Sequence, residues 1–290
     1  MQYVNVSSAR RALNVLLHTE NAKIIAGGTD VMVDYKLGKL SPACLVDISK
    51  ATDMNTIEIK DGYMTIGAVV TLTDLVRSVK VKRNFPSLAK GAGVVGSTQI
   101  RNSATLVGNV VTAQPAADAA MAVSVLEPVF TVLSAAGERE VAMADMYAGF
   151  GRSTVDPSRE LVTQVKIPLL EEDEAAAFET LELRRSLSLP MLSTAAMVKL
   201  VDGKIAKVRI TMSPVGVGPV RAAVAEEYLL GKEPTYEVLK KAGELALENA
   251  NPRSNPLRGS REFRIDTLPV MVRRALEDCC KHIAERKAEK

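Results

Sequence analysis

The chain has few residues that support metal, thiol or imidazole chemistry. Its 290 residues include three cysteines and two histidines. Cys44 stands alone and Cys279 and Cys280 are adjacent, so neither a C-x-x-C pair nor metal-ligand spacing occurs. An iron–sulfur cluster needs about four thiolates, which excludes a cluster held by this chain alone. With only His18 and His282, both predicted on helix surfaces, neither a His-centred triad nor a His-rich metal site is expected.

Aromatic residues, net charge and long apolar runs are also scarce. There is no Trp and aromatic residues make up 4% of the chain, too few for base-stacking platforms. Lys and Arg number 37 against 34 Asp and Glu, too near balance to indicate a nucleic-acid partner. No apolar run reaches the roughly 18 residues that span a bilayer, and the N-terminus does not resemble a signal peptide. We therefore expect a cytoplasmic protein with neither nucleic acid nor membrane as a partner.

What the chain does contain predicts an α+β protein. Its length and its hydrophobic content of 47% suit a globular chain of two or three domains. Strand-like and helical patterns alternate without the regular winding of a Rossmann fold. The pair Asp61-Gly62, favoured in type I′ turns, lies between alternating apolar positions and predicts a hairpin over residues 56–70. Further strands are expected over residues 23–26, 44–48, 129–143 (a second hairpin), 160–168 and 178–183.

A domain boundary is expected near residue 172. Residues 171–174 are all acidic and are typical of a solvated break between elements. Beyond this break, helices are predicted over residues 220–230, 235–249 and 260–282. The chain would therefore divide into residues 1–172 and 173–290.

Two loops bear glycines among small residues. The first loop, 24-IIAGGTDV-31, places two glycines directly after a predicted strand, and the second loop is 105-TLVGN-109. Consecutive backbone N–H groups in such turns can form a concave nest for phosphate oxygens, and glycine permits the close approach that this requires. Two nests would suit a pyrophosphate. Taken alone, each loop is more often an ordinary turn, and Asp118, near a predicted helix start, is compatible with an ordinary N-terminal acidic residue.

The strings themselves resemble a known family. In order along the chain they are 26-AGGTD-30, 65-TIGAVVTLTDL-75, 99-QIRNSATLVGN-109 and 114-QPAAD-118, followed by residues 181–196, 211–231 and 257–264. Together they resemble the FAD-binding subunit, or medium chain, of molybdenum-containing hydroxylases, the group of xanthine, carbon monoxide and nicotinate dehydrogenases. The resemblance implies a two-lobed FAD-binding domain (PCMH-type) over residues 1–172, with lobes of about 1–53 and 54–172. A C-terminal α/β domain of the carbon monoxide dehydrogenase flavoprotein type would cover residues 173–290.

The resemblance also implies the positions that contact FAD. They are the first loop (Ile24, Ile25, Ala26, Gly27, Gly28, Thr29, Asp30, Val31), the second loop (Thr105, Leu106, Val107, Gly108, Asn109), the flavin-flanking Val95 and Val162, the hydrogen-bond acceptor Asp118, and Thr180. Two positions depart from the family. Val107 replaces a usual glycine, and a positive φ there would force the loop onto another path. Thr180 stands where several members carry a lysine. No catalytic residue or metal ligand is expected on this chain.

The function that the resemblance implies is electron transfer. FAD, held non-covalently, would accept electrons from the 2Fe-2S clusters of a small partner subunit, after substrate oxidation on a molybdopterin-binding large subunit. FAD would pass these electrons to NAD⁺, as in xanthine dehydrogenase. The pocket for the substrate that is oxidised would lie on the large subunit. Two alternatives remain: a free-standing flavin oxidase, and a flavin-free scaffold or assembly factor of the same fold. Covalent FAD attachment would use His or Cys, and neither loop contains one.

Overall fold

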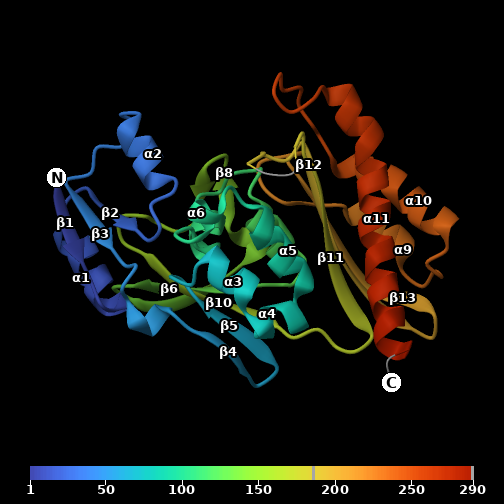
Figure 1. Ribbon diagram of the computed structural model, residues 1–290, viewed down its shortest axis with the longest axis horizontal. Coiled ribbons are helices and arrows are strands. Elements are labelled where there is room, and N and C mark those ends of the chain that lie inside the picture. Colours follow the sequence, from blue (N-terminus) through green and yellow to red (C-terminus); the bar gives the residue numbers. More distant parts are fainter. Residues whose placement is uncertain (185–186, 289–290) are drawn as a thin grey trace. The chain divides into compact units, whose positions relative to one another are not determined.

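The computed structural model describes residues 1–184 and 187–288, which divide into two compact units (Figure 1). Unit 1 comprises Met1–Lys80, Ser97–Ala113 and Glu127–Pro168, and unit 2 comprises Val81–Gly96, Gln114–Leu126 and Leu169–Lys290. The units do not follow chain order, because two segments from the first half of the chain belong to the same unit as the C-terminal part. The boundary near residue 172 stays a prediction about sequence domains.

Unit 1 begins with a three-stranded parallel sheet in the order β1-β3-β2. Its strands are β1 (Gln2–Asn5), β2 (Ala22–Ile25) and β3 (Cys44–Asp47), joined through α1 (Ala9–His18) and α2 (Val31–Lys36). Parallel strands need a crossover connection, which α1 supplies between β1 and β2. The chain therefore starts with a small β-α-β-α-β segment whose strands are parallel. The sequence pattern did not predict this arrangement. Strands of four residues are too short to show the continuous apolar run of a longer parallel strand.

The second sheet of unit 1 has five antiparallel strands in the order β4-β5-β10-β6-β7. Both predicted hairpins are confirmed, and Asp61 and Gly62 have φ of 52° and 79°, the positive values of a type I′ turn. The strands are β4 (Ile57–Lys60), β5 (Tyr63–Gly67), β6 (Val129–Ser134), β7 (Gly137–Ala142) and β10 (Leu161–Pro168). The other elements are η1 (Thr52–Met54), α3 (Leu72–Arg77), α6 (Thr98–Arg101), α7 (Leu106–Val111), η2 (Met143–Asp145), β8 (Tyr147–Gly149) and β9 (Arg152–Ser153).

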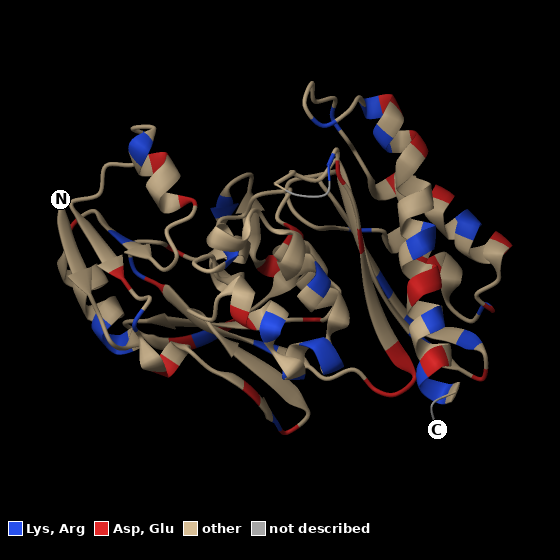
Figure 2. Ribbon diagram, viewed as in Figure 1, with Lys and Arg blue, Asp and Glu red and all other residues tan. Residues whose placement is uncertain are grey.

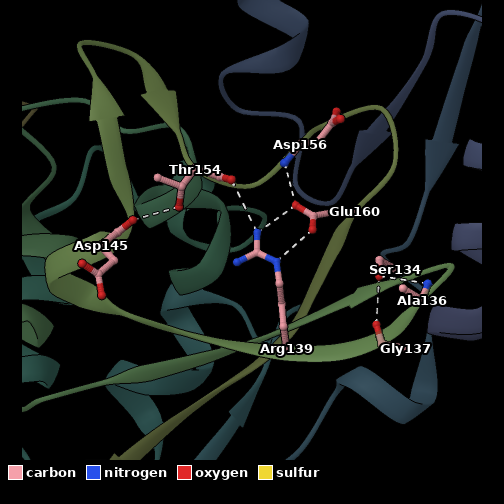
Figure 3. Close-up of polar contacts among 8 residues, drawn as sticks. All are labelled: Ser134, Ala136, Gly137, Arg139, Asp145, Thr154, Asp156 and Glu160. Atoms are coloured by element: carbon pink, nitrogen blue, oxygen red, sulfur yellow. Dashed lines mark hydrogen bonds and ion pairs between the residues drawn. The ribbon is translucent and has the colours of Figure 1, made fainter.

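An ion pair fastens the loop before β10 to strand β7. Arg139 Nε and Nη2 donate to Glu160 Oε1 and Oε2, each at 2.9 Å (Figure 3). Glu160 Oε2 also accepts from the Asp156 amide at 2.8 Å, and Arg139 Nη2 reaches the Thr154 carbonyl at 3.5 Å. One bidentate pair thus holds both the strand and the loop.

We expect Glu160→Gln to lower the free energy of unfolding by about 1 kcal/mol or less at neutral pH, because the Arg139 side chain is 42% exposed. The hydrogen bond from Arg139 lowers the pKa of Glu160. The stabilisation is therefore present above the unfolded-state pKa of about 4.3 and is lost as pH falls through the folded-state value. Urea unfolding of both proteins between about pH 7 and 3 should show the difference shrinking. A difference that stays constant with pH would contradict this reading.

Unit 2 is built on a four-stranded antiparallel sheet in the order β11-β12-β13-β14. Helices α9, α10 and α11 pack toward one face, lined by Ala196 and Ile210, whereas α5 and α8 pack on the face of Ser193 and Thr211 (Figure 1). The strands are β11 (Glu174–Leu181), β12 (Leu192–Val201), β13 (Lys204–Ser213) and β14 (Val220–Arg221). The helices are α4 (Val79–Asn84), α5 (Pro86–Val94), α8 (Asp118–Ser124), α9 (Ala223–Leu229), α10 (Tyr236–Leu245), η3 (Ala246–Asn249) and α11 (Arg261–Ala288).

The acidic stretch 171–174 is only partly the solvated break that was expected. Glu174 is 6% exposed and begins β11, four residues earlier than the predicted strand. Its carboxylate accepts from the Glu171 amide at 3.1 Å and lies 3.7 Å from the Lys207 ammonium. These partners allow a glutamate to be buried where the pattern alone indicated exposure.

Charged side chains of both signs are interspersed along the described chain (Figure 2). On α11, Arg273 Nη1 lies 2.5 Å from Glu277 Oε1, one turn away, and the guanidinium also stacks on the Tyr236 ring. Such local pairing is typical of a solvated helix face. Among the residues that the structure describes, no helix combines the length and the apolarity needed to cross a membrane.

Candidate functional site

The first loop connects the end of β2 to the start of α2 in unit 1. Gly28 has φ of +69°, and within the loop Ile25 is buried, Asp30 is exposed and the other residues are half-buried. Within the described parts of the chain, the amides of Gly27, Gly28, Thr29 and Asp30 donate no hydrogen bond. Consecutive main-chain N–H groups around a positive-φ glycine form the concave arrangement that binds anions. These unused donors make the loop a candidate anion-binding site.

The two glycine loops converge within unit 1. A Cβ atom on Gly27 would lie 1.9 Å from the Ser103 carbonyl oxygen and 2.8 Å from the Ala104 amide nitrogen. These are backbone atoms immediately before the second loop, and only glycine allows such an approach. Two turns that are distant in the sequence therefore lie in contact at this pair of backbones.

The N-terminus of α3 holds the second loop on its other side. The Leu72 amide donates to the Ala104 carbonyl at 2.8 Å, and Thr71 and Thr105 form an isolated β-bridge. Thr71 also forms a capping box with Asp74. The string 65-TIGAVVTLTDL-75 thus supports the second loop as well as starting a helix.

The second loop is the first part of a helix. Thr105, 4% exposed, caps α7 by accepting from the Gly108 amide at 3.0 Å. Val107 lies in the first turn of α7, is 5% exposed and is not among the described residues with positive φ. A β-branched residue is compatible with that backbone, so the altered loop path expected for Val107 is not required.

Asp118 lies in unit 2, at the first position of α8, and is 5% exposed. Its Oδ1 accepts from Ser193 Oγ at 2.9 Å, and Ser193 Oγ lies 3.2 Å from Thr180 Oγ1. Burial raises the pKa of Asp118 to about 7, the Ser193 hydrogen bond opposes this shift, and the charge of Glu182 adds to it. Two predicted site residues, Asp118 and Thr180, are therefore linked through a serine.

Ser193 was missed by the sequence analysis, although it lies in the quoted string 181-LELRRSLSLPMLSTAA-196. That string contains further hydroxyl residues, and nothing in their pattern singles out Ser193. Its alternation on β12 with the core residue Leu192 places it on the face toward α8, which becomes visible only once the sheet register is known.

The remaining predicted positions supply apolar surface. Val162 is 4% exposed on β10, beside a β-bulge, and α7 packs against this strand in unit 1. Ile24 and Ile25 end β2, and in unit 2 the half-buried Val95 ends α5. The structure therefore groups both loops and Val162 in unit 1, and Val95, Asp118 and Thr180 in unit 2.

The donors and acceptors found in each unit suit the parts of a flavin dinucleotide. In unit 1, unused amides and the Gly27 contact favour a diphosphate bound by main-chain dipoles. In unit 2, among the described residues Ser193 is the hydrogen-bond partner recorded for Asp118, and it engages Oδ1 alone. Oδ2 is left to accept from an N–H or hydroxyl group of a ligand.

Known protein families match nearly the whole chain. The family model described as the FAD binding domain in molybdopterin dehydrogenase matches residues 1–170. A second model, the CO dehydrogenase flavoprotein C-terminal domain, matches residues 176–279.

Individual proteins show the same likeness. The glyceraldehyde dehydrogenase medium chain of Sulfolobus acidocaldarius is 27% identical, over 95% of this chain and 97% of its own. The xanthine dehydrogenase FAD-binding subunit of Escherichia coli O157:H7 is 26% identical, over 95% and 94%. A solved carbon monoxide dehydrogenase from Hydrogenophaga pseudoflava superposes with a TM-score of 0.91 at 25% identity, covering 97% of this chain and 98% of that one.

Proposed function

Because the chain belongs to the family of FAD-binding subunits of molybdenum hydroxylases, we propose that it collects electrons from a partner's iron–sulfur clusters and delivers them through FAD to NAD⁺. The observation that carries this proposal is the convergence of the two loops, with the Gly27 backbone against Ser103 and unused amides beside it. A glycine-lined nest of this kind is suited to the diphosphate of a dinucleotide.

The chain's contribution is to bind and orient the cofactor. The first-loop amides would hold the diphosphate, the Thr105-capped start of α7 would complete that site, and Asp118 would accept a hydrogen bond from the flavin side. FAD, when bound, supplies the two-electron redox chemistry itself. No substrate-transforming residue is assigned to this chain, in keeping with a subunit that relays electrons.

The electron source lies on other polypeptides. The cysteines of this chain, Cys44, Cys279 and Cys280, are free thiols, and burial raises the pKa of the latter two. They are too few for a cluster. We therefore assign the partners as a 2Fe-2S small subunit and a molybdopterin-binding large subunit, consistent with relatives named as medium chains and subunits. Free thiols suit the reducing cytoplasm in which we place the complex.

The electron acceptor is proposed to be NAD⁺, and the xanthine dehydrogenase-like reading rests on the likeness to that subunit. Thr180 replaces the lysine of several family members, and its hydroxyl is engaged with Ser193. Anaerobic mixing of the reduced holo-complex with NAD⁺ should give rapid flavin reoxidation. Reoxidation by a quinone dye but not by NAD⁺ would overturn the choice of acceptor while leaving FAD binding intact.

We expect the purified chain to be yellow and to release all of its FAD on denaturation. Non-covalent attachment follows because neither loop contains His or Cys, and Cys44 is fully buried on β3. The measurement is visible absorbance of filtrate and protein after unfolding in guanidinium. Colour that stays with the chain would indicate a covalent flavin oxidase. A chain that remains colourless after incubation with FAD would favour the scaffold.

A further inference from the structure

The Ser193 hydroxyl lies within hydrogen-bond distance of side chains from two other elements of unit 2. Thr180 lies near the end of β11, Ser193 near the start of β12, and Asp118 at the start of α8. Ser193 Oγ lies 3.2 Å from Thr180 Oγ1 and 2.9 Å from Asp118 Oδ1. Thr180 and Ser193 are register partners across the two strands, so the sheet itself fixes their spacing.

The direction of these hydrogen bonds depends on the protonation of Asp118. An ionised carboxylate only accepts, and a serine hydroxyl carries a single hydrogen. When Asp118 is ionised, Ser193 must therefore donate its hydrogen to Asp118, and it cannot at the same time donate to Thr180, the other acceptor within its reach. Ser193 is fully buried. Its removal would leave Oδ1 of a buried carboxylate without a donor, which disfavours the ionised form.

The other charges near Asp118 do not replace this donor. α8 packs against α5, β12 and β13. The charged residue of α5 is Lys90, whose ammonium pairs with Glu179 of β11. β12 and β13 present the hydroxyl groups of Ser193 and Thr211 toward α8. The charged residues on the same sheet face lie farther along the two strands, and two of them pair with carboxylates, Lys199 with Glu171 and Lys207 with Glu174; the third is Arg209. Glu182, just beyond β11, carries a like charge and has a buried oxygen without a hydrogen-bond partner among the described residues. Ser193 is thus the group that favours the Asp118 carboxylate.

We propose that Ser193 is a positioning residue for the cofactor: it fixes Oδ1 of Asp118, favours the carboxylate and leaves Oδ2 to accept from an N–H or hydroxyl group of FAD. The inference rests on the proposed function, since FAD is the ligand that would supply that donor. A ligand donor favours the carboxylate, so FAD affinity should rise with pH as Asp118 ionises. Loss of Ser193 raises the pKa of Asp118, so the rise should move to higher pH.

The experiment compares wild type, Ser193→Ala and Asp118→Asn as full-length chains stripped of FAD. The dissociation constant of FAD is measured by flavin fluorescence from about pH 5 to 9, spanning the ordinary and raised carboxyl range. Infrared carboxyl bands report the ionisation of Asp118 before FAD is added. In Ser193→Ala both midpoints should move up by about one pH unit, a tenfold change in proton affinity, given the strength of hydrogen bonds to charged groups. Asp118→Asn should lose this titration.

Two further variants make the result decisive. Ser124→Ala is the matched control, because Ser124 also hydrogen-bonds from α8 to the sheet, 2.7 Å from Thr211 Oγ1, and should leave both midpoints unchanged. Thr180→Val keeps the side-chain shape and removes the acceptor that competes with Asp118 for the Ser193 hydrogen. It should therefore shift both midpoints downward, which decides the question if Ser193→Ala fails to fold. Unchanged midpoints in Ser193→Ala, or in Thr180→Val should Ser193→Ala not fold, would overturn the positioning role. Wild type that binds no FAD would instead overturn the proposed function, while the infrared titration still tests Ser193.

Discussion

Gly27→Ala should abolish FAD binding and lower the free energy of unfolding by about 3 kcal/mol, near the upper end for overpacking. The new Cβ would lie 1.9 Å from the Ser103 carbonyl oxygen, and a backbone atom cannot rotate away as the end of a side chain can. The two loops must therefore separate, which spreads the amides that would hold the diphosphate. The measurements are FAD binding by fluorescence titration and stability by urea unfolding.

Gly38→Ala is the matched control. Gly38 has φ of +70° just after α2, and a Cβ there would meet no atom within 4 Å. This substitution should lower the free energy of unfolding by about 1–2 kcal/mol, because a residue with a Cβ is strained in the left-handed region. It should leave the affinity for FAD unchanged. Gly28→Val is less suitable, because its Cβ would press on the movable Ile25 and Met32 side chains and not into an open nest. Wild-type FAD affinity in Gly27→Ala would show that loop contact is irrelevant to the cofactor.

Gly91→Ala should destabilise unit 2 by about 2 kcal/mol and weaken FAD binding, because its Cβ would lie 2.3 Å from Ala122 Cβ, where α5 crosses α8. It would also lie 3.1 Å from the Asp118 carbonyl oxygen, so the start of α8 would move. The measurements are urea unfolding and the FAD dissociation constant.

The double variant Gly91→Ala with Ala122→Gly moves the methyl group from one helix to the other. Ala122→Gly alone should lower the free energy of unfolding by about 1 kcal/mol, because glycine has a lower helix propensity than alanine. In the double variant, the higher helix propensity of alanine at position 91 offsets this loss. The double variant should therefore recover most of the lost stability, which gives a coupling free energy of about 3 kcal/mol against the additive loss of the two single variants. Additive losses would mean that the helices do not meet at these residues.

Local sequence patterns predicted much of the fold. The Asp61-Gly62 turn, the Thr71 cap and the glycines of the first loop each have a chemical reason to adopt one backbone form, and the structure shows those forms. The parallel sheet at the N-terminus was not predicted, because each strand has four residues and the paired residues are far apart in the chain, as in Gln2 with Cys44 and Ala22 with Cys44.

The sequence predicted the candidate site residues in unit 1, but only part of those in unit 2. The glycines indicated close approach, but not that the Ser103 backbone is what Gly27 contacts. Ser193 could not be found because its role depends on the packing of α8 on a sheet formed by residues far along the chain. Conversely, the sequence suggested that Val107 would need a positive φ, but its backbone is helical and no such strain arises. Long-range packing decides these cases, and local sequence patterns do not contain it.

Helices α5 and α8 precede the predicted boundary in sequence but complete the layer over the sheet that follows it. A cut near residue 172 would therefore separate that sheet from half of its covering and expose the buried face of Ser193 and Thr211 to water. The two segments matched by separate family models are consequently not interchangeable cassettes. A chimera that joins one segment to a distant relative's other segment is therefore expected to be stable only if α5 and α8 fit the new sheet.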